Sequence, residues 1–278
     1  MTEQAARYDR IAAGYARWWA PVLAPRARAL LDWLEPAVAA GARRLIDVGT
    51  GSGTLAIEAV RRWPEVTVVG IDASRGMAEL AEAEADRLLS RSERRRFDVR
   101  VAFADELPFE AGAFDAAMSS FVFQLVPNRA RALREAGRVV HPGGSLAYVT
   151  WLRDDRIFRP DLEFDAALDD VGLGESDEDE RDGDERPGDI PSVEAAIAQL
   201  RRAGFRDVHA EATMLEHPFD VEGYVGFIAE FDEEDFVSNL EPEIRTRLLD
   251  RLRARLAALP PDALVLRLPV VAASGRRG

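Results

Sequence analysis

The sequence predicts an α/β fold built on a doubly wound, mostly parallel sheet. Between Arg43 and about Leu152, short apolar runs alternate with helical patterns in the rhythm of βαβ units. The first apolar run ends in a glycine-rich turn and continues at once into a helix. The chain has 278 residues, of which 47% are hydrophobic, and this suffices for one large domain with additions.

The segment before the predicted sheet, residues 1–42, is expected to form one or two helices. Its large apolar side chains recur at helical spacing. We expect most of them to pack on the core of the domain. They are Tyr8, Ile11, Tyr15, Trp18 and Trp19.

The first predicted strand, Leu45–Val48, leads into a turn with glycines at positions 49, 51 and 53. Glycine permits positive φ and a close approach of the backbone to a ligand. Dinucleotide-binding turns space their glycines as G-x-G-x-x-G, whereas here Asp47 precedes three glycines in alternate positions. This carboxylate would repel a pyrophosphate and attract a cationic ligand. By itself the turn also fits a simple strand-to-helix connection.

The second predicted strand, Val66–Asp72, follows a helix predicted over Thr54–Arg62 and also ends in an acid. At this edge of a parallel sheet, a carboxylate can accept hydrogen bonds from both hydroxyls of a ribose. Asp72 therefore predicts a nucleoside ligand without saying which one. The alternative is that Asp72 begins the helix predicted over residues 74–90, because acids favour helix starts.

Three more motifs follow in order. Val99–Ala104 predicts a third strand, with Asp105 and Glu106 in the loop after it. Phe114–Ser120 predicts a fourth strand. Arg138–Leu146 contains Pro-Gly-Gly and predicts the turn into a fifth strand.

Together these five motifs resemble, in order, those of the class I S-adenosylmethionine-dependent methyltransferases. The resemblance covers Arg43 to about Trp151 closely and is strongest to the small-molecule branch, which includes quinone-biosynthesis methyltransferases. It implies a Rossmann-like seven-stranded sheet whose antiparallel last strand inserts between the fifth and sixth, with amino-terminal helices and a helical cap. It also implies S-adenosylmethionine as cofactor, no metal, and a small-molecule methyl acceptor.

The resemblance assigns cofactor-binding roles as well. The acid before the glycines suits the cationic methionine end, the second acid the ribose, and the acid after the third strand the adenine. In similar enzymes a helix carrying Tyr-Asp-x-x-Ala-x-x-Tyr lies over the cofactor, and residues 8–15 match it. The predicted cofactor-binding set is Tyr15, Asp47, Gly49, Gly51, Gly53, Asp72, Ala73, Met77, Asp105, Glu106 and Ser119.

Four parts are predicted along the chain: an amino-terminal helical lid (1–42), the cofactor-binding core (43–152), an acidic insertion (153–191) and the rest of the sheet domain (192–278). The last part contains a helix capped by Ser192, a strand at 208–216, helices at 221–231 and 243–259, and a buried strand at 263–272. The segment 220–260 is expected to form the helical cap.

The acidic insertion contains a run, residues 175–185, without a single apolar side chain. Such a run cannot bury itself, so the insertion is expected to be partly mobile. Residues 158–173 are expected to form a helix near the substrate mouth and to act as a lid. A plain surface insertion is the alternative. The substrate pocket itself is expected between the cap, the amino-terminal helix and the sheet.

Composition excludes several classes of function. A net charge of −14 disfavours nucleic-acid binding, and the basic runs Arg43-Arg44 and Arg94–Arg96 are interpreted as solvated faces. The chain has no cysteine, and its three histidines lack metal-ligand spacing. With no secretion signal and no apolar run of ~20 residues, a cytoplasmic enzyme without stable membrane insertion is expected. The oligomeric state stays open.

No catalytic residue is assigned. A methyl group on a sulfonium is already activated, so positioning can supply most of the acceleration, and only a weakly acidic acceptor needs a general base. His217 is the best-placed candidate, whereas His141 and His209 are expected to be structural. Two other functions remain open, namely a nicotinamide-dependent oxidoreductase and a non-catalytic binding protein on the same fold.

Overall fold

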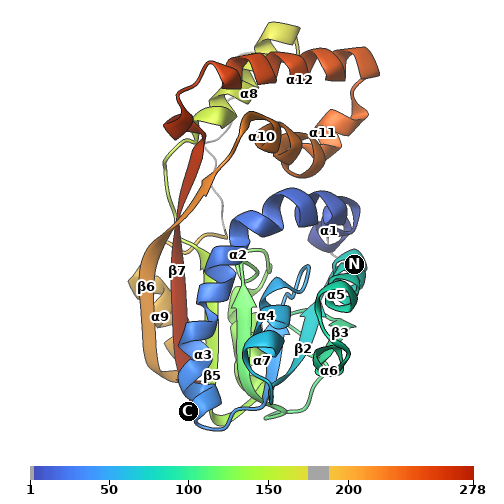
Figure 1. Cartoon of the computed structure of the whole chain (residues 1–278). Coiled ribbons are helices and arrows are strands. Elements are labelled where there is room, and N and C mark those ends of the chain that lie inside the picture. Colours follow the sequence, from blue (N-terminus) through green and yellow to red (C-terminus); the bar gives the residue numbers. More distant parts are fainter. Residues whose placement is uncertain (1–2, 175–187) are drawn as a thin grey trace.

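The computed structural model describes residues 3–174 and 188–278, so the acidic run at 175–185 lies outside the described residues. In the described part of the chain, one sheet contains β1 Arg44–Val48, β2 Thr67–Asp72, β3 Phe97–Val101, β4 Phe114–Ser120, β5 Val140–Trp151, β6 Phe205–Pro218 and β7 Val265–Arg277. The strand order is β3-β2-β1-β4-β5-β7-β6 (Figure 1).

Strands β1 to β5 pair in parallel, whereas β7 is antiparallel to both of its neighbours, β5 and β6. This confirms the seven-stranded, mostly parallel sheet and the insertion of the last strand between the fifth and sixth. The strand order reverses direction between β1 and β4, at the place where open α/β sheets bind ligands beyond the carboxyl ends of their strands.

Helices cover both faces of the sheet because side chains alternate along each strand. Leu45 packs into the core cluster that includes the helices α2 to α5, whereas its neighbour Ile46 packs with α7 and α9 on the other face. These helices are α2 Ala20–Ala29, α3 Leu31–Ala39, α4 Thr54–Arg62, α5 Arg75–Leu88, α7 Arg129–Val139 and α9 Val193–Arg202. The short α6 spans Arg91–Arg94.

A helical cap stands beyond the carboxyl end of the sheet, and the first helix lies between the cap and the sheet (Figure 1). The first helix, α1 Glu3–Gly14, continues into one π-helical turn, η1 Tyr15–Trp19. The cap consists of α8 Arg159–Val171, α10 Val221–Phe227, the π-helical turn η2 Ile228–Asp232, α11 Glu234–Asn239 and α12 Pro242–Ala257, followed by the short η3 Pro261–Leu264.

The cap is held together by a buried carboxylate. Glu163 of α8 is only 6% exposed and forms ion pairs with Arg159 at 2.7 Å and with Arg255 of α12 at 2.9 Å. A buried carboxylate needs such partners. The ion pair between Glu163 and Arg255 therefore joins α8 to α12.

Several predicted element bounds are wrong. The third strand was expected at 99–104, but β3 ends at Val101, which pairs with Asp72 at the end of β2. Ala102 and Ala104 are buried although they lie after the last paired residue of β3. Their apolar side chains therefore led the prediction to place the end of the strand too late. The strands β6 and β7 are longer than predicted, the helix expected over 221–231 changes to π-helical geometry at Ile228, and α11 was not predicted.

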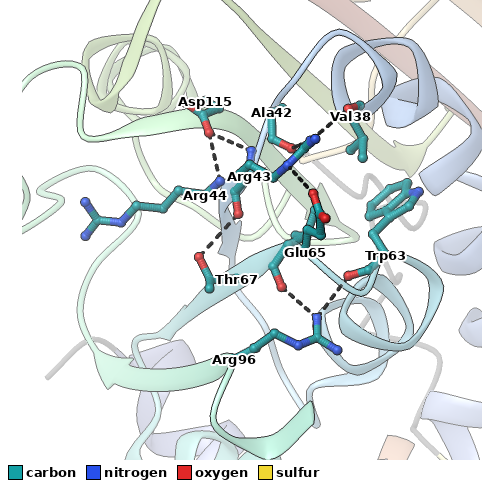
Figure 2. A network of polar contacts seen from close by, with 10 residues as sticks. Val38, Ala42, Arg43, Arg44, Trp63, Glu65, Thr67, Arg96 and Asp115 are labelled. Carbon is teal, nitrogen blue, oxygen red and sulfur yellow. Dashed lines mark hydrogen bonds and ion pairs between the residues drawn. The ribbon is translucent and has the colours of Figure 1, made fainter. Parts of the chain in front are cut away.

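The amino-terminal edge of the sheet is fixed by side-chain bonds to the backbone (Figure 2). Asp115 accepts hydrogen bonds from the backbone N–H groups of Arg43 and Arg44 at 2.7 and 2.8 Å. The guanidinium of Arg43 donates to two backbone carbonyls, and that of Arg96 donates to three. The interpretation of the basic runs as merely solvated faces is therefore wrong for Arg43 and Arg96.

Asp115→Ala is expected to lower the free energy of unfolding by about 2 kcal/mol, because two backbone donors lose a charged acceptor. For a chain of this size, the melting temperature would fall by roughly 4–8 °C. Thermal unfolding followed by circular dichroism measures the change. Asp115→Asn keeps one acceptor and is expected to fall between wild type and Asp115→Ala. A wild-type melting temperature for Asp115→Ala would contradict a stabilising role for this network.

Candidate active site

The turn after β1 brings the backbone against the loop that follows β4. Gly49 has a φ of +73°, and a Cβ placed there would lie 2.2 Å from the side chain of Val122. Only glycine combines this conformation with this approach. The N–H of Gly49 donates to the carbonyl of Ile71 at 2.8 Å, which ties the turn to the end of β2.

Asp72 joins the two loops that meet at this edge of the sheet. One carboxylate oxygen accepts from the N–H of Gly51 and the other from the N–H of Ser74, both at 2.9 Å. Burial raises the pKa of Asp72 above its ordinary value. Each oxygen keeps a lone pair for a further donor. The helix α5 is capped instead by Ser74, whose hydroxyl accepts from the N–H of Met77 at 3.0 Å, so Asp72 is not its cap.

Asp47 is a buried acid with one satisfied oxygen. It is 1% exposed, and its Oδ2 accepts from the hydroxyl of Thr50 at 2.8 Å. Its Oδ1 is buried and has no hydrogen-bond partner among the described residues. Burial raises the pKa of Asp47 to about 7. The acid borders a cavity of about 20 Å³ that Tyr15 and Gly49 also line. Space for a single small polar group thus adjoins an unpaired carboxylate oxygen.

A larger cavity of about 210 Å³ lies over the carboxyl ends of the strands. It is lined by α1, η1 and α2 on one side and by the segments that follow β1, β2, β3 and β4, together with the end of β5, on the other. Seven of the eleven predicted cofactor-binding residues line it, namely Tyr15, Gly49, Gly51, Asp72, Ala73, Met77 and Asp105. Asp47 lines the adjoining small cavity.

The other three predicted residues line neither of these cavities. The hydroxyl of Ser119 is buried and donates to the carbonyl of Val48 at 2.8 Å. The side chain of Glu106 is 81% exposed and forms an ion pair with Arg131. Gly53 starts α4, and a Cβ there would lie 3.3 Å from Ala81. These residues shape the strand ends and helix starts around the cavities.

The first helix is fastened over the cavity by a side-chain contact. Asp9 accepts hydrogen bonds from the hydroxyl of Ser74 at 2.5 Å and from the N–H of Gly76 at 2.8 Å. Both bonds lower the pKa of Asp9. Ser74 also donates its N–H to Asp72. One short segment therefore joins α1, the start of α5 and the acid at the end of β2.

The cap was expected to line the pocket, and this expectation is wrong for the described residues. All residues that line the larger cavity precede position 153, so neither α8 nor the segment 220–260 contributes to it. Instead, Phe227 and Phe231 of the cap pack against the ring of Trp19 at centroid distances of 5.1 and 5.7 Å. The helix α1 and the turn η1 lie between the cap and the sheet, and Trp19 of η1 occupies the place that the prediction gave to the cap (Figure 1).

The histidines lie away from the larger cavity, which none of them lines. The ring of His217 packs on Phe219 at 4.7 Å, and burial lowers its pKa. The ring of His209 lies 5.4 Å from that of Trp33. His141 sits 3.5 Å from Asp115 at the amino-terminal edge. The histidine that the sequence placed best, His217, thus does not line this cavity.

Sequence reasoning missed several residues that line the cavity. They are Gln4, Ala5, Tyr8, Trp19, Leu23, Ser74, Phe103, Phe121, Gln124 and Trp151, with their neighbours in the loops. Their position in the sequence could have identified many of them, because in an open α/β sheet the residues directly after each parallel strand face the ligand. For β4, this rule predicts that the loop after Ser120 lines the cavity.

Among the described residues, no group of three or more acidic or histidine side chains has the arrangement of a metal site. No helix in residues 3–174 or 188–278 combines the length and apolar character that crossing a bilayer requires.

Comparison with known proteins gives three findings. A family model described as a methyltransferase domain matches residues 46–148. The malonyl-[acyl-carrier protein] O-methyltransferase of Geobacter sulfurreducens is 33% identical over 217 residues, which cover 77% of this chain and 72% of that protein. The ubiquinone/menaquinone biosynthesis C-methyltransferase UbiE of Geobacter sp. is 37% identical over 107 residues, which cover 38% of this chain and 44% of that enzyme.

Solved structures share the architecture. The YcgJ protein of Bacillus subtilis superposes with a TM-score of 0.54 at 18% identity, covering 87% of this chain and 96% of that one. At this identity the likeness shows the fold alone. The match to the UbiE enzyme spans less than half of that enzyme's length, and so it leaves the acceptor open.

Proposed function

Because this chain belongs to the class I S-adenosylmethionine-dependent methyltransferases, we propose that it methylates a small molecule held in the cavity between α1 and the sheet. The observation that carries the proposal is a pair of acids at the ends of the adjacent strands β1 and β2, the buried Asp47 and the half-buried Asp72. Both border the glycine turn, where the backbone can approach a ligand closely.

The residues present fit S-adenosylmethionine. The unpaired oxygen of Asp47 suits its ammonium group, and the free lone pairs of Asp72 suit the two ribose hydroxyls. Asp105, after β3, would accept from the adenine amino group. The other proposed cofactor contacts that line the cavities are Tyr15, Gly49, Gly51, Ala73 and Met77.

When bound, the cofactor would supply a methyl group that its sulfonium sulfur already activates for in-line transfer to the acceptor. The protein positions the cofactor and the acceptor relative to each other. Tyr15 and Trp19 of η1 and the loop after β4 enclose the cavity, and they exclude water from the reacting atoms. No histidine lines the cavity, which agrees with a reaction driven by positioning.

Calorimetric titration with S-adenosylmethionine, S-adenosylhomocysteine and NAD in parallel tests the proposal. We expect micromolar binding of the first two and no binding of NAD, because Asp47 disfavours a pyrophosphate. Binding of NAD alone would support the nicotinamide oxidoreductase instead. Binding without methyl transfer to any metabolite of a broad panel would support the non-catalytic alternative.

Asp9→Ala is expected to weaken S-adenosylhomocysteine binding about tenfold, because the lid helix loses two hydrogen bonds to the start of α5. The dissociation rate, measured by stopped-flow fluorescence, should rise while the association rate changes little. Asp250→Ala, which changes an exposed acid on α12 that pairs with Arg253 of the same helix, serves as the matched control. An unchanged dissociation rate in Asp9→Ala would show that this contact does not hold the lid closed.

A further inference from the structure

The loop after β4 and the end of β5 form a part of the cavity that the proposed cofactor contacts leave free. Its lining comes from residues 120–122 and 124–127 and from Trp151, with Trp19 of η1 on the opposite side. Among the described residues, Asp72 and Asp105, both assigned to the cofactor, are the only formally charged side chains that line the cavity. In this part of the chain an anionic acceptor would therefore meet two carboxylates and no basic side chain.

Aromatic rings form one wall of this part. The ring of Phe121 lies 4.4 Å from that of Trp151, and Trp151 lies 6.1 Å from Trp19. Trp19 is fixed from behind by the cap, where Phe231 stacks on it at an interplanar angle of 21°. Rings held in this way offer a rigid apolar surface, which suits a flat apolar ligand.

Gln124 is the polar side chain held in place beside this wall. The hydroxyl of Thr150, itself fully buried, donates to Oε1 of Gln124 at 2.6 Å. Nε2 of Gln124 donates to the carbonyl of Phe121 at 2.7 Å. Phe121 has a φ of +57°, a conformation that side chains other than glycine rarely adopt, and it places this carbonyl.

These two hydrogen bonds are half of the four that the side-chain amide of Gln124 can form. An amide of this kind has two N–H donors and two lone pairs, so one donor and one acceptor remain. Gln124 lines the cavity, half-buried, with its orientation set by two neighbours. An immobilised amide beside an apolar wall can recognise one polar group of a ligand at little entropic cost.

On these observations, and given the proposed function, we infer that the methyl acceptor is an uncharged molecule with a flat apolar body, oriented by a hydrogen bond from one of its oxygens to Gln124. This acceptor class differs from that named for the malonyl-[acyl-carrier protein] relative, since a malonyl group ends in a carboxylate. Gln124 is then a specificity-determining residue, and Thr150 is a positioning residue that acts through it.

Matched ligands test the inference. The quenching of tryptophan fluorescence is titrated with 2-naphthol and with 2-naphthoate, near neutral pH, on the protein saturated with S-adenosylhomocysteine. The two probes share one ring system and differ in charge. We expect 2-naphthol to bind at least about tenfold more tightly, because the carboxylate loses water without gaining a cationic partner. Equal or tighter binding of 2-naphthoate, or no binding of 2-naphthol, would overturn the inference.

Variants test the role of the amide. Gln124→Leu is expected to weaken 2-naphthol binding about tenfold while the affinity for S-adenosylhomocysteine stays within twofold of wild type. Thr150→Val should weaken it by a smaller factor, and Thr150→Ser, which restores the hydroxyl, should rescue it. Gln199→Leu, on α9 and outside the cavity lining, is the matched control.

Different results would contradict the inference about the acceptor and the proposed methyltransferase function. Unchanged 2-naphthol affinity in a folded Gln124→Leu protein would remove Gln124 from the acceptor site and leave the methyltransferase proposal intact. Failure of wild type to bind S-adenosylhomocysteine would reject the proposed function itself. Thermal unfolding of each variant separates a lost contact from a lost fold.

Discussion

Asp72→Ala is expected to raise the dissociation constant for S-adenosylhomocysteine on the order of 100-fold, because two ribose hydroxyls lose a charged acceptor. Calorimetry measures the affinity, and circular dichroism verifies the fold. The structure adds a second effect. The N–H groups of Gly51 and Ser74 also lose their acceptor, so the melting temperature should fall by several degrees.

Two other variants separate these effects. Asp72→Asn keeps one carbonyl oxygen and is expected to lose less affinity than Asp72→Ala. Asp98→Ala, on the neighbouring strand β3 and paired only with Arg100 on the surface, should leave affinity unchanged. Wild-type affinity in folded Asp72→Ala protein would remove Asp72 from the ribose site.

Asp47→Asn is expected to stabilise the ligand-free protein and to weaken cofactor binding at the same time. The pKa of Asp47 rises from its ordinary 3.8 to about 7 because the carboxylate is buried. Between these values the folded chain binds more protons than the unfolded chain. Stability therefore falls as the pH rises through this window, and the full cost is present above about pH 7.

Asparagine removes that cost because it carries no charge. The melting temperature of Asp47→Asn should exceed that of wild type by several degrees at about pH 8 and match it at about pH 4. Thermal scans across this range measure the difference. A variant that is less stable than wild type at about pH 8 would show that the buried carboxylate is better accommodated than its unpaired oxygen indicates.

Whereas the stability of the ligand-free protein falls as the pH rises, its affinity for the cofactor should increase. Since an ammonium group binds the ionised carboxylate, the affinity of wild type for S-adenosylhomocysteine should increase from about pH 6 to about pH 8, with release of up to one proton. Calorimetry in buffers of different ionisation enthalpy counts that proton. Asp47→Asn should bind roughly tenfold more weakly at about pH 8, with a flat pH dependence. A wild-type pH profile in the variant would remove Asp47 from the ammonium site.

The sheet could be predicted from sequence because local patterns determine it. The strand β4 and the helix α4 occur at the bounds predicted for them, and Ser192 caps α9 as expected. Here short apolar runs are bounded by turns, and each run matches one element. The acids of the site could be predicted for a similar reason, since Asp47 and Asp72 lie at the carboxyl ends of β1 and β2 and Asp105 lies in the loop after β3.

The walls of the cavity could not be predicted in the same way. An apolar helix face shows that a surface is buried, but it does not show what covers it. The cap as a whole was expected to border the pocket, yet Phe227 and Phe231 of the cap pack on Trp19. The two π-helical turns lie against each other although they are far apart in the sequence. Gly14, directly before η1, lies so close to η2 that a Cβ would overlap the carbonyl of Glu230. Local sequence patterns do not reveal such a contact.

The place of β7 in the sheet has a consequence for how the chain reaches its fold. This strand is hydrogen-bonded on both sides, to β5 and to β6. Until residues 265–277 have left the ribosome, β5 and β6 each keep an open edge that can pair with another chain. Synthesis of the cofactor site is complete by Trp151, long before those edges close. Folding of the sheet is therefore delayed to a late stage of synthesis, and the nascent chain is most exposed to aggregation before that stage.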